Sequence, residues 1–585
     1  MTNHPNLIFW GSYIFLNLLL FVPLYVLNQH STYFFPLSAT TEGFSITTLK
    51  ELLLWRNNFD IFRLNSEMLF LVSLWVFVPW LRLTPMHHIY RWLCGLLYFI
   101  ILIYAAYEGI MLTLYQVDPV FYSQFWLVAD GLEVLVRNLE LPWRLYFFGG
   151  IGFITFVVVI GKLIGLVIGG VPVERLSIPS KVGLALLTLV VMFSVAIYRS
   201  FLASPQMQIS SFTYKLRHNI IASAEAYERV NAYDDGAAQD TYNYTAHKLL
   251  RTPNIYLIFI ESYGSVLYKR PDYKEQYLAL VPPLEAQLSA NDWHVASTLS
   301  EAPTWGGGSW MAYTSLLFGL RVDTHAQYLS LVDQYQTADY PDLGQYLKSQ
   351  GYTYLRLSSL SDELKEDKQQ VLRNFYGVDD WPTYSDLNFT GRHFGWGPAP
   401  PDQYALSYIY QTRLQHLETP FFLFYVTQNS HFPWVPLPEV ADDWRTLNKP
   451  PTTPEPELPS TIPHQVKRQN YFNSIDYELT FLTDYIIKMG GKDSIFILIG
   501  DHQPPQVSRH NDSFDTPIHI ISQDKGLTDR LDAYGFVPGF AVQDEVATIR
   551  HEGFYSMFVR LLNDRYGNRT RALPKYRPWG IPIGE

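Results

Sequence analysis

Cysteine is almost absent from this chain of 585 residues, which contains only Cys94. A single cysteine excludes an internal disulfide framework and a zinc site built from cysteines, and it does not indicate a cellular compartment. Basic residues are also outnumbered, because 43 Lys and Arg stand against 54 Asp and Glu and leave a net charge of −11. That balance argues against a nucleic-acid-binding protein, since phosphate backbones require a positive field. It does not exclude a local cationic pocket.

Charge is scarcest in the first 200 residues, which are rich in Leu, Phe, Ile and Val. Four stretches there are apolar enough to cross the hydrocarbon core of a membrane: Leu7–Leu27, Trp92–Leu114, Leu145–Gly161 and Val182–Tyr198. Only Glu108 interrupts the second of them, either as a functional group or as a side chain that reaches the membrane surface. Met68–Leu81 is shorter and is either a tilted span or a re-entrant segment. We predict a helical membrane domain of about five spans over residues 1–200.

Lysine and arginine in the short loops predict the orientation of the spans. Arg82 and Arg91 follow the short stretch, and Arg175 and Lys181 precede the last span, so both loops are predicted to be cytoplasmic. The loop over about 115–143 is mainly acidic and is predicted to be external. The chain start lacks a basic n-region and a cleavage site, so the first span is interpreted as an anchor. Five spans then place the rest of the chain outside the cytoplasm, in a multi-pass protein of the cell (inner) membrane with a periplasmic or extracellular domain.

The second half of the chain alternates apolar strands with helices. Residues 201–252 predict connector helices at the membrane surface, and residues 253–563 predict an α/β domain with a mostly parallel sheet sandwiched by helices. The predicted strands are Ile255–Ile260, Tyr352–Leu357, Phe421–Val426 and Ser494–Ile499, and the predicted helices are Trp310–Phe318, Leu343–Ser349 and Ser474–Met489.

Proline interrupts this pattern in two places. Eight prolines within 436–463 remove too many backbone donors for a regular helix or central strand, so this segment is predicted to be an irregular loop and a candidate lid. Residues 564–585 are predicted to be an irregular C-terminal tail.

Potential metal ligands follow the ends of three predicted strands. Glu261 follows the first strand, Ser430-His431 the third and Asp501-His502 the last. Because the carboxyl ends of parallel strands meet at one edge of a sheet, these residues are expected to lie together. Carboxylate and imidazole ligands suit zinc or manganese.

Ser309 lies behind three glycines and at the start of the helix predicted over Trp310–Phe318. A hydroxyl beside a metal ion loses its proton more easily and becomes a nucleophile. The glycines allow close approach of backbone N–H groups to an anion, and the helix N-terminus adds positive potential for a phosphate. The alternatives are a flexible loop, or a serine that only caps the helix.

These motifs resemble the alkaline phosphatase/sulfatase superfamily, in its membrane-anchored branch of lipoteichoic acid synthases and lipid phosphoethanolamine transferases. The resemblance covers about residues 253–525 and rests on four short motifs in this order: Ile-Phe-Ile-Glu261-Ser-Tyr, Ser309 ten residues before Gly319, Thr427-Gln-Asn-Ser-His431-Phe-Pro, and Gly500-Asp501-His502. The membrane spans before the catalytic domain are similar to those of lipoteichoic acid synthase. An alkaline-phosphatase-like fold is therefore expected.

The resemblance implies a site that holds one divalent metal ion, Mn²⁺ or Zn²⁺, with ligands Glu261, Ser309, Asp501 and His502. It implies that Ser309 attacks the phosphorus of a lipid head group and carries it as a covalent intermediate while diacylglycerol leaves. An acceptor hydroxyl or water then takes the group. His431 matches a substrate-site histidine of the family, which protonates or binds the leaving oxygen.

The chain also departs from the family patterns. Neither the proline nor the arginine of the formylglycine sulfatases follows Ser309, which argues against that activity. Related enzymes use a threonine nucleophile, so Thr304 is the alternative nucleophile. Arg356 ends a predicted strand and either binds a phosphate or is a surface arginine. Trp310 and Trp434 either stack on an acceptor or serve in packing.

The sequence thus predicts a membrane transferase that moves phosphoglycerol or phosphoethanolamine from a phospholipid donor to an envelope glycan or lipid. A metal-dependent phosphodiesterase, phosphatase or sulfatase-like hydrolase that uses water is the first alternative. A non-catalytic module for envelope polysaccharide assembly is the second. No motif identifies the donor or the acceptor.

Overall fold

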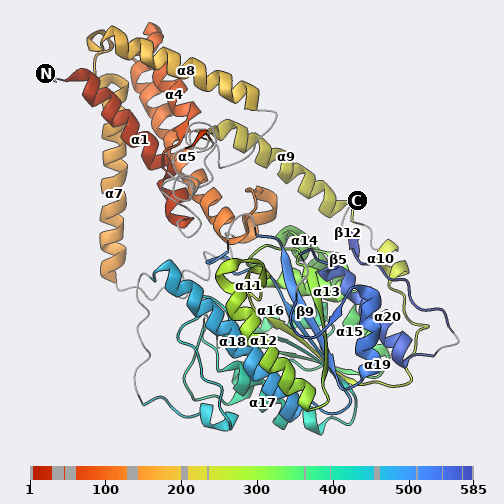
Figure 1. Cartoon of the computed structure of the whole chain (residues 1–585). Coiled ribbons are helices and arrows are strands. Elements are labelled where there is room, and N and C mark those ends of the chain that lie inside the picture. Colours follow the sequence, from red (N-terminus) through yellow and green to blue (C-terminus); the bar gives the residue numbers. More distant parts are fainter. Residues whose placement is uncertain are drawn as a thin grey trace. The chain divides into compact units, whose positions relative to one another are not determined.

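The computed structural model describes residues 4–28, 45–46, 61–127, 143–198, 208–233, 236–361, 364–395, 397–452, 462–508, 512–542, 545–568 and 571–582. The chain divides into two compact units, Met1–Ala226 and Tyr227–Glu585 (Figure 1). The first unit is helical, and the second contains a large mixed sheet.

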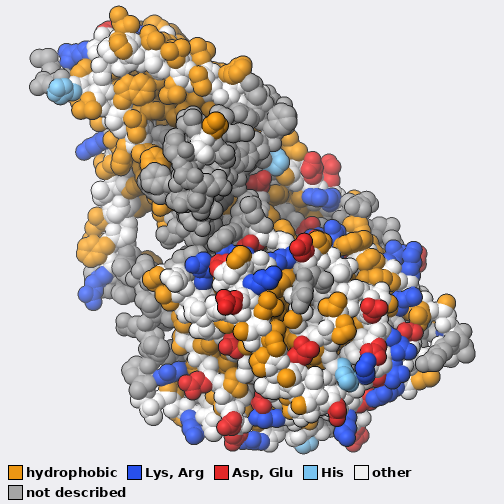
Figure 2. Space-filling model, viewed as in Figure 1, with side chains coloured by type: hydrophobic (Ala, Val, Ile, Leu, Met, Phe, Trp, Pro, Cys, Tyr) orange, Lys and Arg blue, Asp and Glu red, His pale blue; other side chains and the backbone are white. Residues whose placement is uncertain are grey.

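The first unit contains four helices long and apolar enough to span a membrane: Pro5–Leu27, Met86–Leu114, Tyr146–Gly170 and Ile178–Ala196. They correspond to helices α1 (Pro5–Leu27), α5 (Met86–Leu114), α7 (Trp143–Gly165) and α8 (Ile178–Tyr198). Figure 2 shows hydrophobic side chains over these helices and mixed charges over the second unit. Large exposed side chains such as Trp92, Phe153 and Phe193 are typical of a lipid-facing surface.

The short stretch predicted over Met68–Leu81 does not form a continuous helix. Helix α4 (Ser66–Phe77) has 12 residues and ends before Val78, which is extended. A separate 3₁₀ turn, Pro79–Arg82, follows it. The residue before a proline is forced out of helical geometry, which explains the break. Twelve residues span only about 18 Å, against a hydrocarbon core of about 30 Å. The predicted five spans are therefore four long helices and one short one, and the orientation that relied on an odd number remains a prediction.

Glu108 lies inside the first unit. It is buried, and its carboxylate makes a 2.6 Å ion pair with the ammonium of Lys215 in α9 (Phe212–Asn231). The acid in the predicted span thus has an internal partner.

The second unit contains an eight-stranded sheet with the order β10-β4-β9-β8-β3-β7-β6, to which β11 adds beside β4. The four strands predicted from the sequence are parallel neighbours that form one side of the sheet, with β6 at its edge: β3 (Asn254–Ile260), β6 (Thr353–Leu357), β7 (Phe421–Val426) and β8 (Ser494–Gly500). The others are β4 (His294–Glu301), β9 (Asp515–Ser522), β10 (Val537–Pro538) and β11 (Ile549–Arg550). Strand β9 runs antiparallel to both of its neighbours and β10 runs antiparallel to β4. The remaining pairings are parallel, so the sheet is mostly parallel, as predicted.

Helices cover both faces of this sheet (Figure 1). Alternate residues of β3 enter two separate cores: Leu257 and Phe259 face one, and Tyr256 and Ile258 face the other. One core includes residues of α13 (Ser309–Phe318), α14 (His325–Tyr335), α15 (Leu343–Ser349), α16 (Glu366–Phe375) and α20 (Phe554–Tyr566). The other includes residues of α12 (Pro271–Ala290), α17 (Asp402–Thr412) and α18 (His464–Met489).

The proline-rich segments contain little regular structure. Within 436–452 the structure contains a single 3₁₀ turn, Trp444–Leu447, and residues 453–461 lie outside the described residues. Helix α20 ends at Tyr566, and the tail beyond it forms β12 (Ile581–Pro582), which pairs with β5 (Leu320–Arg321).

Candidate metal centre and nucleophile

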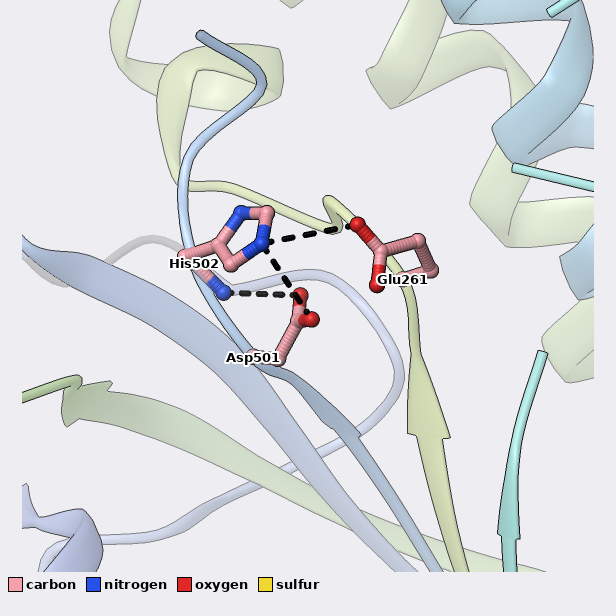
Figure 3. A group of neighbouring side chains, drawn as sticks. All are labelled: Glu261, Asp501 and His502. Atoms are coloured by element: carbon pink, nitrogen blue, oxygen red, sulfur yellow. Dashed lines mark hydrogen bonds and ion pairs between the residues drawn. The ribbon is translucent and has the colours of Figure 1, made fainter. Parts of the chain in front are cut away.

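Three potential ligands meet at the carboxyl edge of the parallel strands. Glu261 follows β3, and Asp501 and His502 follow β8; Ile260 and Gly500 are paired in register. One ligand atom from each residue lies within 4.8 Å of the other two, and all three residues are buried. Figure 3 shows the three side chains directed toward one another. Adjacent parallel strands thus bring together residues 240 positions apart in the chain.

Backbone N–H groups hold one oxygen of the Asp501 carboxylate, and its other oxygen accepts no hydrogen bond from a described residue. Its Oδ1 accepts hydrogen bonds from the N–H groups of Ser262 and His502, both at 2.8 Å. Its Oδ2 is buried, makes no hydrogen bond to any described residue and lies 3.4 Å from His502 Nε2. A buried carboxylate oxygen without a donor is costly and indicates a missing partner.

The Glu261 carboxylate lies on the opposite side of the centre. Its Oε1 accepts a 3.0 Å hydrogen bond from the Ser262 hydroxyl and lies 3.4 Å from His502 Nε2. The Glu261 N–H donates to Thr427 Oγ1 at 3.1 Å, so β7 also helps to hold this residue. Ser262 has a φ of +60°, a region that non-glycine residues seldom adopt. This backbone conformation directs the Ser262 N–H to Asp501 and its hydroxyl to Glu261.

The electrostatics of the group favour a bound cation. Burial and then the negative charge of Glu261 raise the pKa of Asp501 to about 7. Burial lowers the pKa of His502, but Asp501 and Glu261 outweigh it and raise that pKa above its ordinary value. His502 Nδ1 lies 2.8 Å from the Gln503 carbonyl and donates to it, which leaves the Nε2 lone pair facing the carboxylates. Two carboxylate oxygens and an imidazole nitrogen fit a divalent ion such as zinc or manganese.

The structure places Ser309 against this ligand group. Its Oγ donates to Glu261 Oε2 at 3.2 Å and lies 3.3 Å from His502 Nε2. Gly307 and Gly308 have φ values of +61° and +67°, left-handed conformations that explain the glycines before the serine. Gly308 is the N-cap of α13 and Ser309 is its first residue, so the alternative that Ser309 is only the N-cap is wrong.

Thr304 lies elsewhere in the same loop. Its hydroxyl donates to the carbonyl oxygens of Gly306 and Gly307, at 3.3 and 3.0 Å. Thr304 therefore stabilises the glycine turn, whereas Ser309 contacts the ligands.

His431 follows β7 at the same edge of the sheet. Its Nδ1 lies 2.7 Å from the Phe432 carbonyl, which identifies Nδ1 as the donor and Nε2 as the basic atom. Burial lowers its pKa, and the charges of His502 and Asp501 are near enough to act on it. The imidazole is therefore predominantly neutral near pH 7.

The remaining predicted residues divide between the core and the edge of the site. Trp434 is 1% exposed, and its indole N–H donates to Ser430 O at 2.8 Å, so it serves in packing, one of the two roles that the sequence left open. Trp310 is partly buried and donates to His325 Nδ1 at 3.2 Å. Arg356 is not a surface arginine, because it is only 7% exposed on β6.

Arg356 lies in a cage of aromatic rings. Its guanidinium carbon is 4.4 Å from the ring centroids of Tyr376 and Phe424, 4.8 Å from Trp381 and 5.1 Å from Tyr313. Its Nε and Nη1 are buried without hydrogen bonds to the residues that the structure describes. The side chain is thus a buried cation stabilised by aromatic faces.

The sequence analysis assigned no role to Ser262, Thr427 or Tyr313, although the first two lie within its motifs. Tyr313 is four residues after Ser309 and so lies on the same face of α13, a spacing that could have identified it. The backbone conformation of Ser262 leaves no such signal in the sequence.

No family model and no curated protein matches this chain significantly. Solved structures similar to it include the lipoteichoic acid synthase LtaP from Listeria monocytogenes, with 12% identity over 59% of this chain and 80% of that one and a TM-score of 0.36. The soluble domain of a lipooligosaccharide phosphoethanolamine transferase from Neisseria meningitidis is 13% identical over 55% of this chain and 91% of that one, with a TM-score of 0.36. An alkaline phosphatase superfamily protein from Vibrio parahaemolyticus is 15% identical over 57% of this chain and 77% of that one, with a TM-score of 0.37.

These structures come from the superfamily and the branch that the sequence motifs resemble.

Proposed function

We propose that this chain is a metal-dependent membrane transferase that moves phosphoglycerol or phosphoethanolamine from a phospholipid to an envelope glycan or lipid. The observation that carries the proposal is the contact of Ser309 Oγ with Glu261 and His502 at the N-terminus of α13. A hydroxyl that contacts two potential metal ligands suits a nucleophile, and it suits neither core packing nor helix capping.

Glu261, Asp501, His502 and Ser309 would hold one divalent ion, Mn²⁺ or Zn²⁺, in this proposal. Such an ion lowers the pKa of a bound hydroxyl and stabilises negative charge on phosphoryl oxygens. The unpartnered Asp501 Oδ2 supports this ligand set, because it is a buried acceptor without a donor.

The chain's own residues suit both halves of the transfer. In the first half, Ser309 loses its proton and its Oγ forms a bond to phosphorus, while the bond from phosphorus to the diacylglycerol oxygen breaks. In the second half, an acceptor hydroxyl loses its proton and displaces Ser309 from phosphorus. His431 has a pKa lowered by burial, so its neutral Nε2 is suited to take the proton released in each half, from Ser309 and then from the acceptor hydroxyl. It returns that proton to the oxygen that leaves phosphorus, which is the diacylglycerol oxygen in the first half and Ser309 Oγ in the second.

Positive potential for the phosphate group has two sources. The N-terminus of α13 presents backbone N–H groups just after the glycine turn. Arg356 contributes a buried cation that pairs with no carboxylate in the described ranges. Both features favour an anionic substrate over a neutral one.

The four long apolar helices support a lipid donor, because they keep the enzyme at the membrane surface. We further propose that the second unit lies outside the cytoplasm, in the periplasm or extracellular space, where envelope acceptors are present. No nucleic-acid partner is expected from the net charge of −11.

Mass spectrometry of Ser309 tests the proposal. The full chain, loaded with Mn²⁺ or Zn²⁺, is incubated with vesicles of phosphatidylglycerol or phosphatidylethanolamine, and the peptide that contains Ser309 is weighed. A phosphoglycerol or phosphoethanolamine adduct on Ser309, absent from Ser309→Ala and present in Thr304→Val, is the expected result. An adduct on Thr304, or one that persists in Ser309→Ala, would contradict the proposed nucleophile. Release of the head group to water without any acceptor product would indicate a hydrolase.

A further inference from the structure

We propose that Tyr313 contacts the substrate and donates a hydrogen bond from its hydroxyl to a phosphoryl oxygen of the phosphodiester at Ser309. This inference rests on the proposed function and extends it, because it assigns the tyrosine to an anionic tetrahedral phosphorus group. Tyr313 is four residues after Ser309 on α13, so the two side chains lie on the same face of the helix.

The position of the Tyr313 ring follows from the helix and the sheet. Helical side chains lean toward the N-terminus of their helix, which directs Tyr313 to the end that carries Ser309. Its ring packs against Phe259 of β3, with centroids 5.8 Å apart, and against Phe424 of β7, with centroids 5.3 Å apart. Phe259 is two residues before Glu261, so the phenol lies close to the carboxyl edge of the sheet.

The Tyr313 hydroxyl has no partner within the described part of the chain. It makes no hydrogen bond there, and the Tyr313 residue is partly buried, whereas the unpaired hydroxyls of Tyr354 and Tyr485 belong to buried residues. Asp501 and Glu261 are near enough for their negative charges to act on Tyr313. A phenol beside the ligand group whose hydroxyl has no partner among the described residues is therefore available to a ligand.

Arg356 holds the Tyr313 ring in place, and burial keeps its phenol protonated. The guanidinium lies over the Tyr313 ring at 5.1 Å and helps to hold it in place. Burial raises the pKa of Tyr313, while the charge of Arg356 acts in the opposite direction and does not reverse the shift. The phenol therefore keeps its proton at physiological pH and serves as a hydrogen-bond donor, not as a base.

Such a donor matches the needs of phosphoryl transfer. As the bond from Ser309 Oγ to phosphorus forms and the bond to diacylglycerol breaks, negative charge lies on the non-bridging oxygens. A donor already in place at those oxygens stabilises the transition state without reorganisation. Tyr313 keeps its own proton throughout, so the proton balance of the transfer is unchanged.

Tyr376 provides a matched control. Its ring lies on the same guanidinium, 4.4 Å from the Arg356 carbon, but its hydroxyl is hydrogen-bonded to Thr314 Oγ1 at 2.7 Å. Tyr376→Phe and Tyr313→Phe each remove one hydroxyl from the same aromatic cage. Only Tyr313→Phe removes a hydroxyl that has no hydrogen bond to a described residue.

The test compares both variants with the unchanged full chain, loaded with metal. Tyr313→Phe is expected to lower kcat for head-group transfer by about 10²-fold, the usual effect of removing one transition-state donor. Metal content, Tm and the shape of the pH profile should stay unchanged, and Tyr376→Phe should retain most of its activity. Equal activity of Tyr313→Phe and the unchanged chain would overturn the inference, as would a loss that comes with loss of metal or a lower Tm.

Binding of inorganic phosphate to the metal-loaded chain separates this inference from the proposed function. Tyr313→Phe is expected to weaken phosphate binding about 10-fold, and Tyr376→Phe is expected to leave it unchanged. If the unchanged chain forms no adduct on Ser309 but binds phosphate through Tyr313, the transferase proposal fails and the anion contact stands. If phosphate binding is the same in both variants and in the unchanged chain, the Tyr313 contact is refuted whatever the activity.

Discussion

Replacement of Asp501 by asparagine should stabilise the metal-free protein and abolish its response to metal. Asparagine keeps the shape of the side chain and an oxygen that can accept from the N–H groups of Ser262 and His502. It removes the negative charge that lies buried beside Glu261. The substitution therefore separates the free-energy cost of burying the Asp501 charge from the role of its carboxylate as a metal ligand.

The pKa of Asp501 sets the size of the effect. Burial, followed by the charge of Glu261, raises this pKa from 3.8 to about 7 in the folded protein. A carboxyl group whose pKa rises on folding favours the folded state below its unfolded pKa, and this contribution is lost as the pH rises to the folded value. At about 1.4 kcal/mol for each pKa unit, ionised Asp501 costs the metal-free protein roughly 4 kcal/mol above pH 7. Asp501→Asn should recover most of that free energy at pH 8 and almost none of it at pH 4.

Metal reverses the order of stability. A ligand present at about 100 times its Kd stabilises the folded state by about 2.7 kcal/mol. The unchanged chain should gain this stabilisation from Mn²⁺ or Zn²⁺, whereas Asp501→Asn should gain little. Thermal unfolding of the full chain in detergent, with chelator or with metal at pH 4, 6 and 8, measures both effects, together with the metal content after gel filtration.

Asp342→Asn is the matched control. Asp342 is also buried, and burial raises its pKa to about 7, but it is the N-cap of α15 and belongs to no ligand group. Its substitution should reproduce the pH effect and retain the response to metal. If Asp501→Asn lowers the Tm of the chelated protein at pH 8, or if its metal content matches that of the unchanged chain, the reasoning about this centre is refuted.

Three further predictions concern the surrounding structure. Burial and then the charge of Asp402 raise the pKa of Glu478, so the stability that its neutral form contributes is lost as the pH rises above the ordinary pKa of 4.5. Glu478→Gln should therefore make the Tm depend less on pH between pH 5 and 8. An unchanged slope of Tm against pH would oppose this. Glu108→Gln should destabilise the first unit by about 3–5 kcal/mol, because it leaves the Lys215 ammonium, whose side chain is only 11% exposed, without the carboxylate that pairs with it. Lys215→Met in the same chain should restore much of the loss in denaturant unfolding. Gly319→Ala should lower stability by at least about 1–2 kcal/mol, because φ is +69° and a Cβ would clash with the hydroxyl of the buried Tyr242. An unaltered Tm would exclude this strain.

The sequence predicted the elements whose signal is local. Strands β3, β7 and β8 are continuous apolar runs, and such runs identify buried parallel strands without knowledge of their neighbours. The ligands directly after β3 and β8 could be grouped for the same reason, since parallel strands share one carboxyl edge. The long membrane helices were equally evident from their length and apolar composition.

Strands β4 and β9 escaped sequence analysis because their residues are not uniformly apolar. Ser297 and Thr298 of β4, and Pro517 and His519 of β9, lie within buried strands that pair with each other. The Ser297 hydroxyl and His519 Nδ1 are 2.7 Å apart, so one polar group satisfies the other. Such pairing depends on the partner strand, which local sequence does not reveal.

By itself, the sequence determined an apolar helical half, a mostly parallel sheet and a set of ligand-type residues at the ends of its strands. Only the tertiary structure decided that Ser309 contacts Glu261 and His502, whereas Thr304 stabilises the glycine turn. It also decided that Trp434 is a core residue and that Arg356 is a buried cation whose guanidinium lies over the Tyr313 ring. The physical reason is that hydrophobic periodicity is a property of neighbouring residues, whereas these contacts depend on strand register and on how α13 packs across the sheet.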